Sequence, residues 1–268
     1  MRPTAQAERQ AAERAGSIRR DYGLGTAPIG EVAELVATCA QCDVTVMTMP
    51  VGVDGVIARD PRTRRSIVAV AATDAWARQR MTLAHELGHL VFDRLDRDLP
   101  ADCAGDSAAE SQVTSFGRHL LAPRAGVSAL LERAGAVRGA VDESHLSQVV
   151  VHYGVSPEVA AIQMRDEGWT HDPQAAQWIA GTVTTKHLAT RYGWAAEHEC
   201  LVASAQTQRP PARLLRDATD AYVAGKVSVG TVAAVLGKDI AAVRAELDAE
   251  GIEPQTPEVP WFDFNADV

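Results

Sequence analysis

Two histidines and one glutamate in this chain have the types and the spacing that suit a catalytic metal ion. His85 and His89 are four residues apart, and Glu86 directly follows the first of them. On an α-helix, residues four apart lie on one face, so the two imidazoles can hold one zinc ion together. The Glu86 carboxylate can then accept a proton from the water at that ion and deliver it to a leaving amine. This His-Glu-x-x-His pattern is typical of zinc peptidases.

The residues around the motif predict the helix that the pattern requires. Thr73 and Asp74 are candidate N-caps. Apolar side chains then recur at helical spacing, at Trp76, Leu83, Leu87 and Leu90. We therefore predict a helix from Ala75 to Phe92. The alternative is a surface helix that carries two histidines by chance.

A tetrahedral zinc site needs a third protein ligand in addition to the two histidines and a water. Candidate donors after the motif are Asp93, Asp96, Asp98, Asp102, Cys103, Asp106, Glu110 and His119. We favour Glu110, because it lies on the next predicted helix and the chain after His89 is long enough for a loop and an antiparallel return. Gly117, on the same side of that helix, would allow a close approach. The alternative is a capping box, in which Glu110 bonds the backbone of Ser107.

The predicted fold is α+β and mostly helical. Three short strands, at 43–49, 53–58 and 66–71, have tight connections and predict a small three-stranded antiparallel sheet beside the zinc-binding helix. An extended peptide could pair with an edge of that sheet.

Five parts follow one another along the chain. We expect a zinc peptidase domain (1–125), a helix-turn-helix-like helical segment that completes it (126–168), an irregular connecting region (169–208), a C-terminal helical module (209–252) and a flexible tail (253–268). In the second part, Ser156 is a candidate cap, with Pro157 at the first helical position. The connecting region contains one candidate strand, Ile179–Thr184.

Cys39 and Cys42 form a Cys-x-x-Cys pair. A redox pair and half of a zinc site are two functional interpretations. The sequence has no second such pair, and no strand precedes this one. We therefore expect structural cysteines that behave as small hydrophobic residues.

Composition limits the classes of function. With 46% hydrophobic residues and no long apolar run, the chain is typical of a globular protein without a membrane span. The first twenty residues lack the apolar core of a secretory signal, so we expect a cytoplasmic protein. The net charge of −9 opposes non-specific binding to nucleic acid.

Several stretches resemble the ImmA/IrrE-type zinc metallopeptidases, a gluzincin-like family. They are Arg78–His89, the run Glu110, Val113, Phe116, Leu120, Leu121 and Pro123, and Leu146–Ser156. The resemblance spans about residues 28–168. It implies a cytoplasmic endopeptidase whose Zn²⁺ is held by His85, His89 and Glu110. It also implies that the substrate is a helix-turn-helix repressor, whose cleavage relieves repression of stress or mobile-element genes.

Peptide hydrolysis also needs a donor that stabilises the oxyanion. Tyr153, His119 and His152 are the candidates, and the sequence leaves the choice among them open.

Two alternatives remain beside the peptidase. A DNA-binding transcriptional regulator is favoured by the helix-turn-helix-like outlines, but a recognition helix that faces phosphates should be basic. Residues 141–168 contain five acidic residues against one arginine, and residues 213–251 contain six acidic against five basic residues. The other alternative is a zinc-binding sensor without proteolysis.

Overall fold

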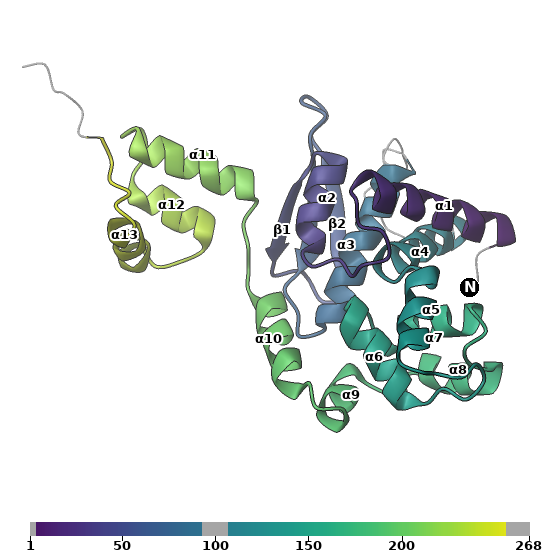
Figure 1. The fold of residues 1–268 in the computed structure, drawn as a ribbon. Coiled ribbons are helices and arrows are strands. Elements are labelled where there is room, and N and C mark those ends of the chain that lie inside the picture. The colour runs from purple at the N-terminus through teal and green to yellow at the C-terminus, as the bar shows by residue number, and fades with distance from the viewer. Residues whose placement is uncertain (1–3, 93–106, 256–268) are drawn as a thin grey trace, which may run out of the picture. The chain divides into compact units, whose positions relative to one another are not determined.

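The structure is a computed structural model, which describes residues 4–92 and 107–255. The chain divides into two compact units, one up to Gln208 and one from Arg209 (Figure 1). The first unit contains α1 (Ala5–Asp21), α2 (Val32–Ala40), β1 (Asp43–Met47), β2 (Gly55–Arg59), β3 (Ser66–Ala71), α3 (Trp76–Val91), α4 (Ser107–Leu121), α5 (Arg124–Arg133), α6 (Glu143–Tyr153), α7 (Pro157–Asp166), α8 (Asp172–Ile179), α9 (Thr185–Arg191) and α10 (Ala195–Gln206). The second contains α11 (Ala212–Val223), α12 (Val229–Leu236) and α13 (Ile240–Ala249).

The three strands form one mixed sheet, so the prediction of an antiparallel sheet was wrong. The strand order is β1-β3-β2, with β2 antiparallel and β1 parallel to β3. β3 takes the centre because it is the most continuously apolar strand, with Val68 and Val70 fully buried. β2 pairs on the far side of β3, which leaves β1 and β3 running in the same direction.

The first half of α3 is fixed by hydrogen bonds from its side chains to distant backbone. Gln79 Nε2 donates to the carbonyls of Ala71, which ends β3, and of Ala205 in α10, at 2.8 Å each. The guanidinium of the half-buried Arg80 donates to the carbonyls of Ile29, Gly30 and Gly154. These bonds fix α3 against the sheet, α10 and the turn between α6 and α7.

α3 and α4 pack very closely against each other. A Cβ atom on Gly88 would lie 2.7 Å from Val113 Cγ1, and one on Gly117 would lie 2.7 Å from Met81 Cε. At Gly88 the neighbours are the stiff side chains of Val113 and Phe116, whereas at Gly117 the neighbour is the flexible end of Met81. The two glycines therefore allow the helices to approach, as the sequence suggested for Gly117.

Glu8 connects α1 to α4 and α5 through charged hydrogen bonds. Its carboxylate lies 2.8 Å from His119 Nε2, 3.2 Å from Arg118 Nη2 and 2.8 Å from Arg124 Nη2. Ser115 Oγ also donates to it. Burial by itself raises the pKa of Glu8, but the hydrogen bonds and charges of these partners outweigh burial and lower the pKa to about 2.

The chain from α5 to α10 adds only helices to the first unit. The strand predicted at Ile179–Thr184 does not form, since α8 ends and α9 begins around this segment. The predicted cap of α7 is present, because Ser156 Oγ accepts from the Val159 N–H at 3.2 Å. Gly154 closes α6 with a positive φ of 63°, a conformation that favours glycine.

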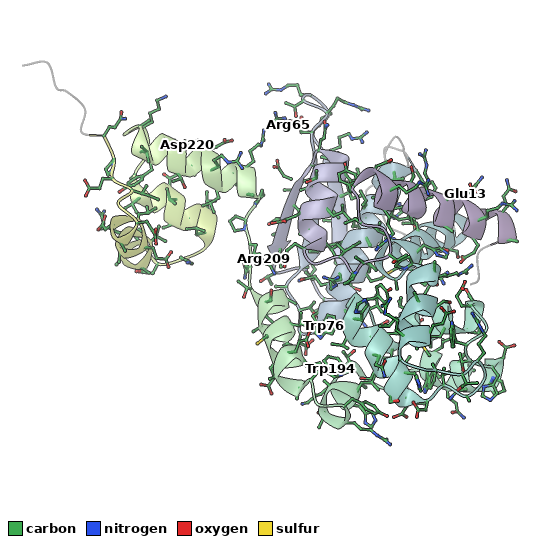
Figure 2. The ribbon with its side chains drawn as sticks, viewed as in Figure 1. Glu13, Arg65, Trp76, Trp194, Arg209 and Asp220 are labelled. Carbon is green, nitrogen blue, oxygen red and sulfur yellow. The ribbon has the colours of Figure 1, made fainter. Side chains whose placement is uncertain are left out.

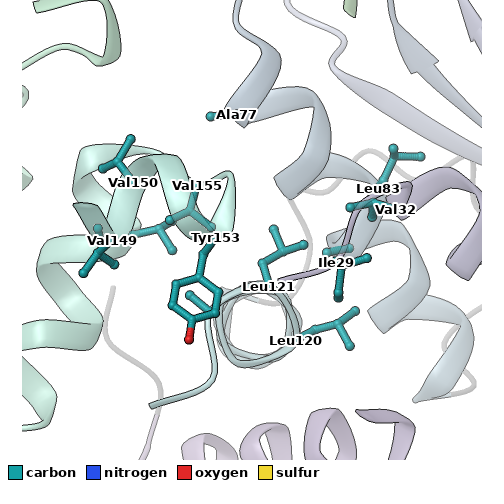
Figure 3. Close-up of a cluster of buried hydrophobic side chains, with 14 of the residues drawn as sticks. Ile29, Val32, Ala77, Leu83, Leu120, Leu121, Val149, Val150, Tyr153 and Val155 are labelled. Atoms are coloured by element: carbon teal, nitrogen blue, oxygen red, sulfur yellow. The ribbon is translucent and has the colours of Figure 1, made fainter. Parts of the chain in front are cut away.

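The buried side chains of α6 join the same core as those of α3 and α4. Val149, Val150 and Tyr153 lie in one cluster with Leu83 of α3 and Leu121 of α4 (Figure 3). α6 and α7 thus present their apolar residues to this core.

The second unit has a small core of its own. Tyr222, Val232 and Val243 bring together its three helices. Asp239 caps α13 by accepting from the backbone N–H groups of Ala241 and Ala242. A role of these helices in recognition stays a prediction. Of the predicted flexible tail, residues 256–268 lie outside the described residues.

Among the described helices, none combines the length and the apolar character that a membrane span requires.

Replacing Glu8 with glutamine should destabilise the first unit in a pH-dependent way. The pKa of Glu8 falls from 4.5 to about 2 on folding, so its stabilisation is present above about pH 4.5 and is lost as the pH falls toward 2. We expect a loss of about 2–3 kcal/mol in the free energy of unfolding at neutral pH. Urea denaturation at neutral and acidic pH measures it, with exposed Glu13→Gln as the control. A loss that does not change with pH would contradict the assigned role.

Candidate metal centre

The structure brings three of the predicted site residues together. His85 Nε2 lies 3.1 Å from His89 Nε2 and 3.0 Å from Glu110 Oε2. His89 Nε2 lies 3.5 Å from Glu110 Oε1. Both oxygens of Glu110 therefore lie against the imidazoles, a position that favours the ligand interpretation over the capping one. The candidate ligands from Asp93 to Asp106 lie outside the described residues.

These three side chains fit a zinc ion. Bonds of about 2.0–2.2 Å in a tetrahedral site place the ligand atoms roughly 3.3–3.5 Å apart, close to the separations between His85, His89 and Glu110. Imidazole nitrogens with a carboxylate oxygen are donors that suit zinc. Burial lowers the pKa of His85 to about 4, so its imidazole is neutral near pH 7, the form that binds metal.

The hydroxyl of Thr114 lies behind the first histidine. Its Oγ1 is 3.4 Å from His85 Nδ1, the ring nitrogen opposite the metal-facing one. Such a partner orients a ligand imidazole and fixes which nitrogen carries the proton. The sequence analysis missed Thr114, although its position one helical turn after Glu110 places it on the same face of α4.

Glu86 is buried beside this cluster. Burial, and then the negative charge of Glu110, raise the pKa of Glu86 to about 7. A carboxyl group with a pKa near neutrality can both accept and return a proton at physiological pH. The position and the pKa of Glu86 therefore suit a general base and acid.

Gly55, at the start of β2, is a second residue that the sequence analysis missed. A Cβ atom there would lie 2.5 Å from Thr82 Cγ2 and 3.1 Å from Glu86 Oε1. Glycine is therefore required for β2 to pass directly beside α3. An isolated glycine in a strand pattern is the signal that could have indicated this approach.

The three candidate oxyanion stabilisers have contacts elsewhere in the first unit. The Tyr153 hydroxyl donates to the Thr26 carbonyl at 3.2 Å, and Figure 3 shows its ring within the apolar cluster. His119 Nε2 bonds to Glu8, and the His152 ring packs edge-on against Tyr153. None of these contacts involves His85, His89 or Glu110, so the structure assigns the role of oxyanion stabiliser to none of the three candidates.

Cys39 and Cys42 have environments typical of structural cysteines. Cys42 is buried and donates from Sγ to the Val36 carbonyl at 3.8 Å. Burial, and then the charge of Asp43, raise the pKa of its thiol to about 11, and burial also raises the pKa of Cys39. Since thiolates are the reactive and metal-binding form, these shifts favour the structural interpretation.

A His-Glu-x-x-His helix with an acidic residue from the next helix defines a site of the metallopeptidase class. Residues 39–165 match the family model of peptidase M78, described as the IrrE N-terminal-like domain. The match confirms the resemblance to ImmA/IrrE-type peptidases seen in the sequence. The matched residues include His85, His89 and Glu110, whereas α1 and the helices from α8 onward lie outside the match. No curated protein matches the chain.

Glu110→Gln should weaken zinc binding while the fold is retained. The amide keeps the shape of the side chain but removes the charge from the third ligand. Changes behind metal ligands already cost roughly 10–100-fold in affinity, so we expect at least about 100-fold here. Zinc titration against a fluorescent chelator measures it, with exposed Glu132→Gln as the control. Unchanged affinity would support the capping interpretation, because glutamine also serves in a capping box.

Glu86→Gln should stabilise the metal-free protein above neutral pH. The pKa of Glu86 is about 7 in the folded state and 4.5 ordinarily, so ionisation costs the folded state stability as the pH rises from about 4.5 to 7. Glutamine avoids this cost, and we expect a gain of up to about 3 kcal/mol near pH 8 that vanishes below about pH 4.5. Urea denaturation in the presence of a chelator measures it. A gain of equal size at both pH values would contradict the assigned burial effect.

Proposed function

We propose that this protein is a zinc-dependent endopeptidase of the cytoplasm that cleaves a helix-turn-helix transcriptional repressor. The observation that carries the enzymatic part is the convergence of His85, His89 and Glu110 with the buried Glu86 beside them. The match of residues 39–165 to a peptidase family supports the same reaction class.

The residues divide the work of hydrolysis. His85, His89 and Glu110 would hold the ion, and Thr114 would orient the first imidazole. When bound, zinc supplies a Lewis acid that polarises the scissile carbonyl and makes water more acidic. Glu86 accepts the proton of the attacking water and then delivers it to the leaving amine.

β2 provides an edge at which an extended peptide can pair. It is an edge strand of the described sheet. The Ala71 N–H bonds to the Asp54 carbonyl at 2.9 Å, and the antiparallel register then alternates. The backbone groups of Gly55 and Ile57 therefore point away from β3, toward the open side of β2. A substrate strand added there would pass Glu86, which lies beside Gly55.

The charge of the second unit opposes a role in DNA binding. In the second unit the basic residues are outnumbered, with Arg213, Arg216, Lys226, Lys238 and Arg244 against six acidic residues between 213 and 251. Such a surface releases few counterions from a duplex. We propose that this unit recognises protein and that the repressor is its partner. Cleavage of the repressor would then relieve repression of stress or mobile-element genes.

The proposal is tested with the zinc-loaded protein, a candidate repressor encoded beside its gene, and Glu86→Gln. We expect the wild type to cleave the repressor and the variant to keep zinc but lose cleavage by at least roughly 100-fold, since proton transfer by a positioned group contributes about 10²–10⁴. Gel analysis and metal analysis are the readouts. Zinc binding without cleavage by the wild type would favour the sensor, and cleavage that persists in the variant would remove Glu86 from the mechanism.

A further inference from the structure

The hairpin between β2 and β3 carries a concentrated positive charge. Residues 59–65 contain four arginines and one acidic residue, whereas the chain as a whole has a net charge of −9. Arg62, Arg64 and Arg65 are exposed, and Arg59 is half-buried. Figure 1 shows this hairpin extending past the end of α2, and Figure 2 shows nitrogen-ended side chains spreading from it near Arg65.

The acidic residue of the hairpin is used within the turn. Asp60 Oδ1 accepts from the backbone N–H groups of Arg62 and Thr63 at 2.8 and 3.3 Å, and Oδ2 accepts from the Thr63 hydroxyl at 2.7 Å. These hydrogen bonds lower the pKa of Asp60. Among the ion pairs of the described residues, none includes Arg62 or Arg65. The turn is therefore ordered by Asp60, while these two guanidinium groups stay available to a partner.

The hairpin continues the strand that lies beside Glu86. Gly55 is in contact distance of Glu86, and Arg59 follows four residues later on the same face of β2. The Asp60 N–H donates to the Arg65 carbonyl, so the two residues lie opposite each other across the hairpin. Because Asp60 directly follows Arg59, the side chains of Asp60 and Arg65 lie on the face opposite to that of Arg59. A peptide strand paired with the open edge of β2 would meet positive charge at the hairpin, whichever face its side chains point to.

The other end of β2 has a different character. Val51 and Val53 precede it with exposed side chains, at 106% and 39% relative exposure, next to the half-buried Gly55. Asp54, between Val53 and Gly55, is paired with Arg78 at 3.9 Å, so its charge is balanced there. An excess of positive charge therefore lies at the hairpin end of β2, on one side of the scissile bond. Antiparallel pairing, the more stable arrangement, places the hairpin on the N-terminal side of that bond.

We propose that the hairpin 59–65 is a docking site for an acidic segment of the protein substrate, roughly four to six residues N-terminal to the scissile bond. The inference rests on the proposed peptidase function and adds a determinant of its substrate choice. Arginine suits this role because its planar donors match carboxylates. A rim of exposed charge changes association more than it changes the chemical step.

The test compares three peptides that share one cleavable sequence. One carries two glutamates at these N-terminal positions, one carries two lysines there, and one carries the glutamates at the same distance on the C-terminal side. We expect kcat/KM of the first to exceed that of the second by roughly three- to tenfold, because exposed ion pairs are weak individually and two charges are reversed. The preference should fade near 1 M salt, where the screening length is about 3 Å. The third peptide should show no gain.

Charge reversal at the hairpin should reverse this ranking. In Arg62→Glu/Arg65→Glu, the lysine peptide should become the better substrate, whereas Arg9→Glu/Arg14→Glu, an equal charge change on exposed positions of α1, should keep the wild-type ranking. An unchanged ranking in the hairpin variant, or a gain for the C-terminal glutamates, would overturn the proposal. Salt-sensitive duplex DNA binding that the hairpin variant loses, with an unaltered peptide ranking, would assign the hairpin to nucleic acid instead.

Peptide binding separates failure of this inference from failure of the peptidase proposal. Fluorescence anisotropy with zinc-loaded Glu86→Gln measures Kd of the same three peptides without turnover. The same charge ranking in Kd, without cleavage by the wild type, would keep the docking site and reject the peptidase. Cleavage by the wild type with equal Kd values and equal rates for all peptides would do the reverse.

Discussion

The site depends on how closely α3 and α4 approach each other. Gly88 on α3 faces Val113 of α4 at a distance that excludes a Cβ atom, and Gly117 on α4 lies against the flexible end of Met81 on α3. Two histidines on one helix provide too few protein ligands for a zinc ion, so a third ligand must come from another helix. The glutamate side chain has a limited reach. Only close packing of the helices can bring Glu110 within 3.0 Å of His85. A methyl group at Gly88 would collide with Val113 and Phe116 and push Glu110 away from the two histidines.

Burial then gives neighbouring groups on α3 the properties that the reaction requires. It keeps the imidazole of His85 neutral and raises the pKa of Glu86 into the range where a proton can be taken and returned. The same burial destabilises the ionised carboxylate of Glu86 in the metal-free protein, and such a loss of stability is typical of active sites. α3 and its neighbour α4 must therefore be fixed by contacts elsewhere.

Elements on both sides of the family match provide those contacts. α1 precedes residues 39–165 and holds α4 and α5 through Glu8. α10 follows them, and its Ala205 carbonyl accepts from Gln79 of α3 and from the Thr73 N–H just before that helix. The peptidase helices are thus held by segments that the family pattern does not include.

The sequence by itself determined the parts whose signal is local. The histidine spacing, the apolar periodicity of α3, the three strand segments and the cap at Ser156 could all be read from neighbouring residues. The tertiary structure decided what depends on long-range pairing: the insertion of β3 between β1 and β2, the turn between α8 and α9 in place of the strand predicted at Ile179–Thr184, and the proximity of Gly55 to Glu86. It also placed Tyr153 in contact with Thr26 and His119 in contact with Glu8, so neither contact involves the candidate metal ligands. Spacing along a chain fixes which residues share a face of one element, but which elements then meet is set by packing between segments far apart in sequence.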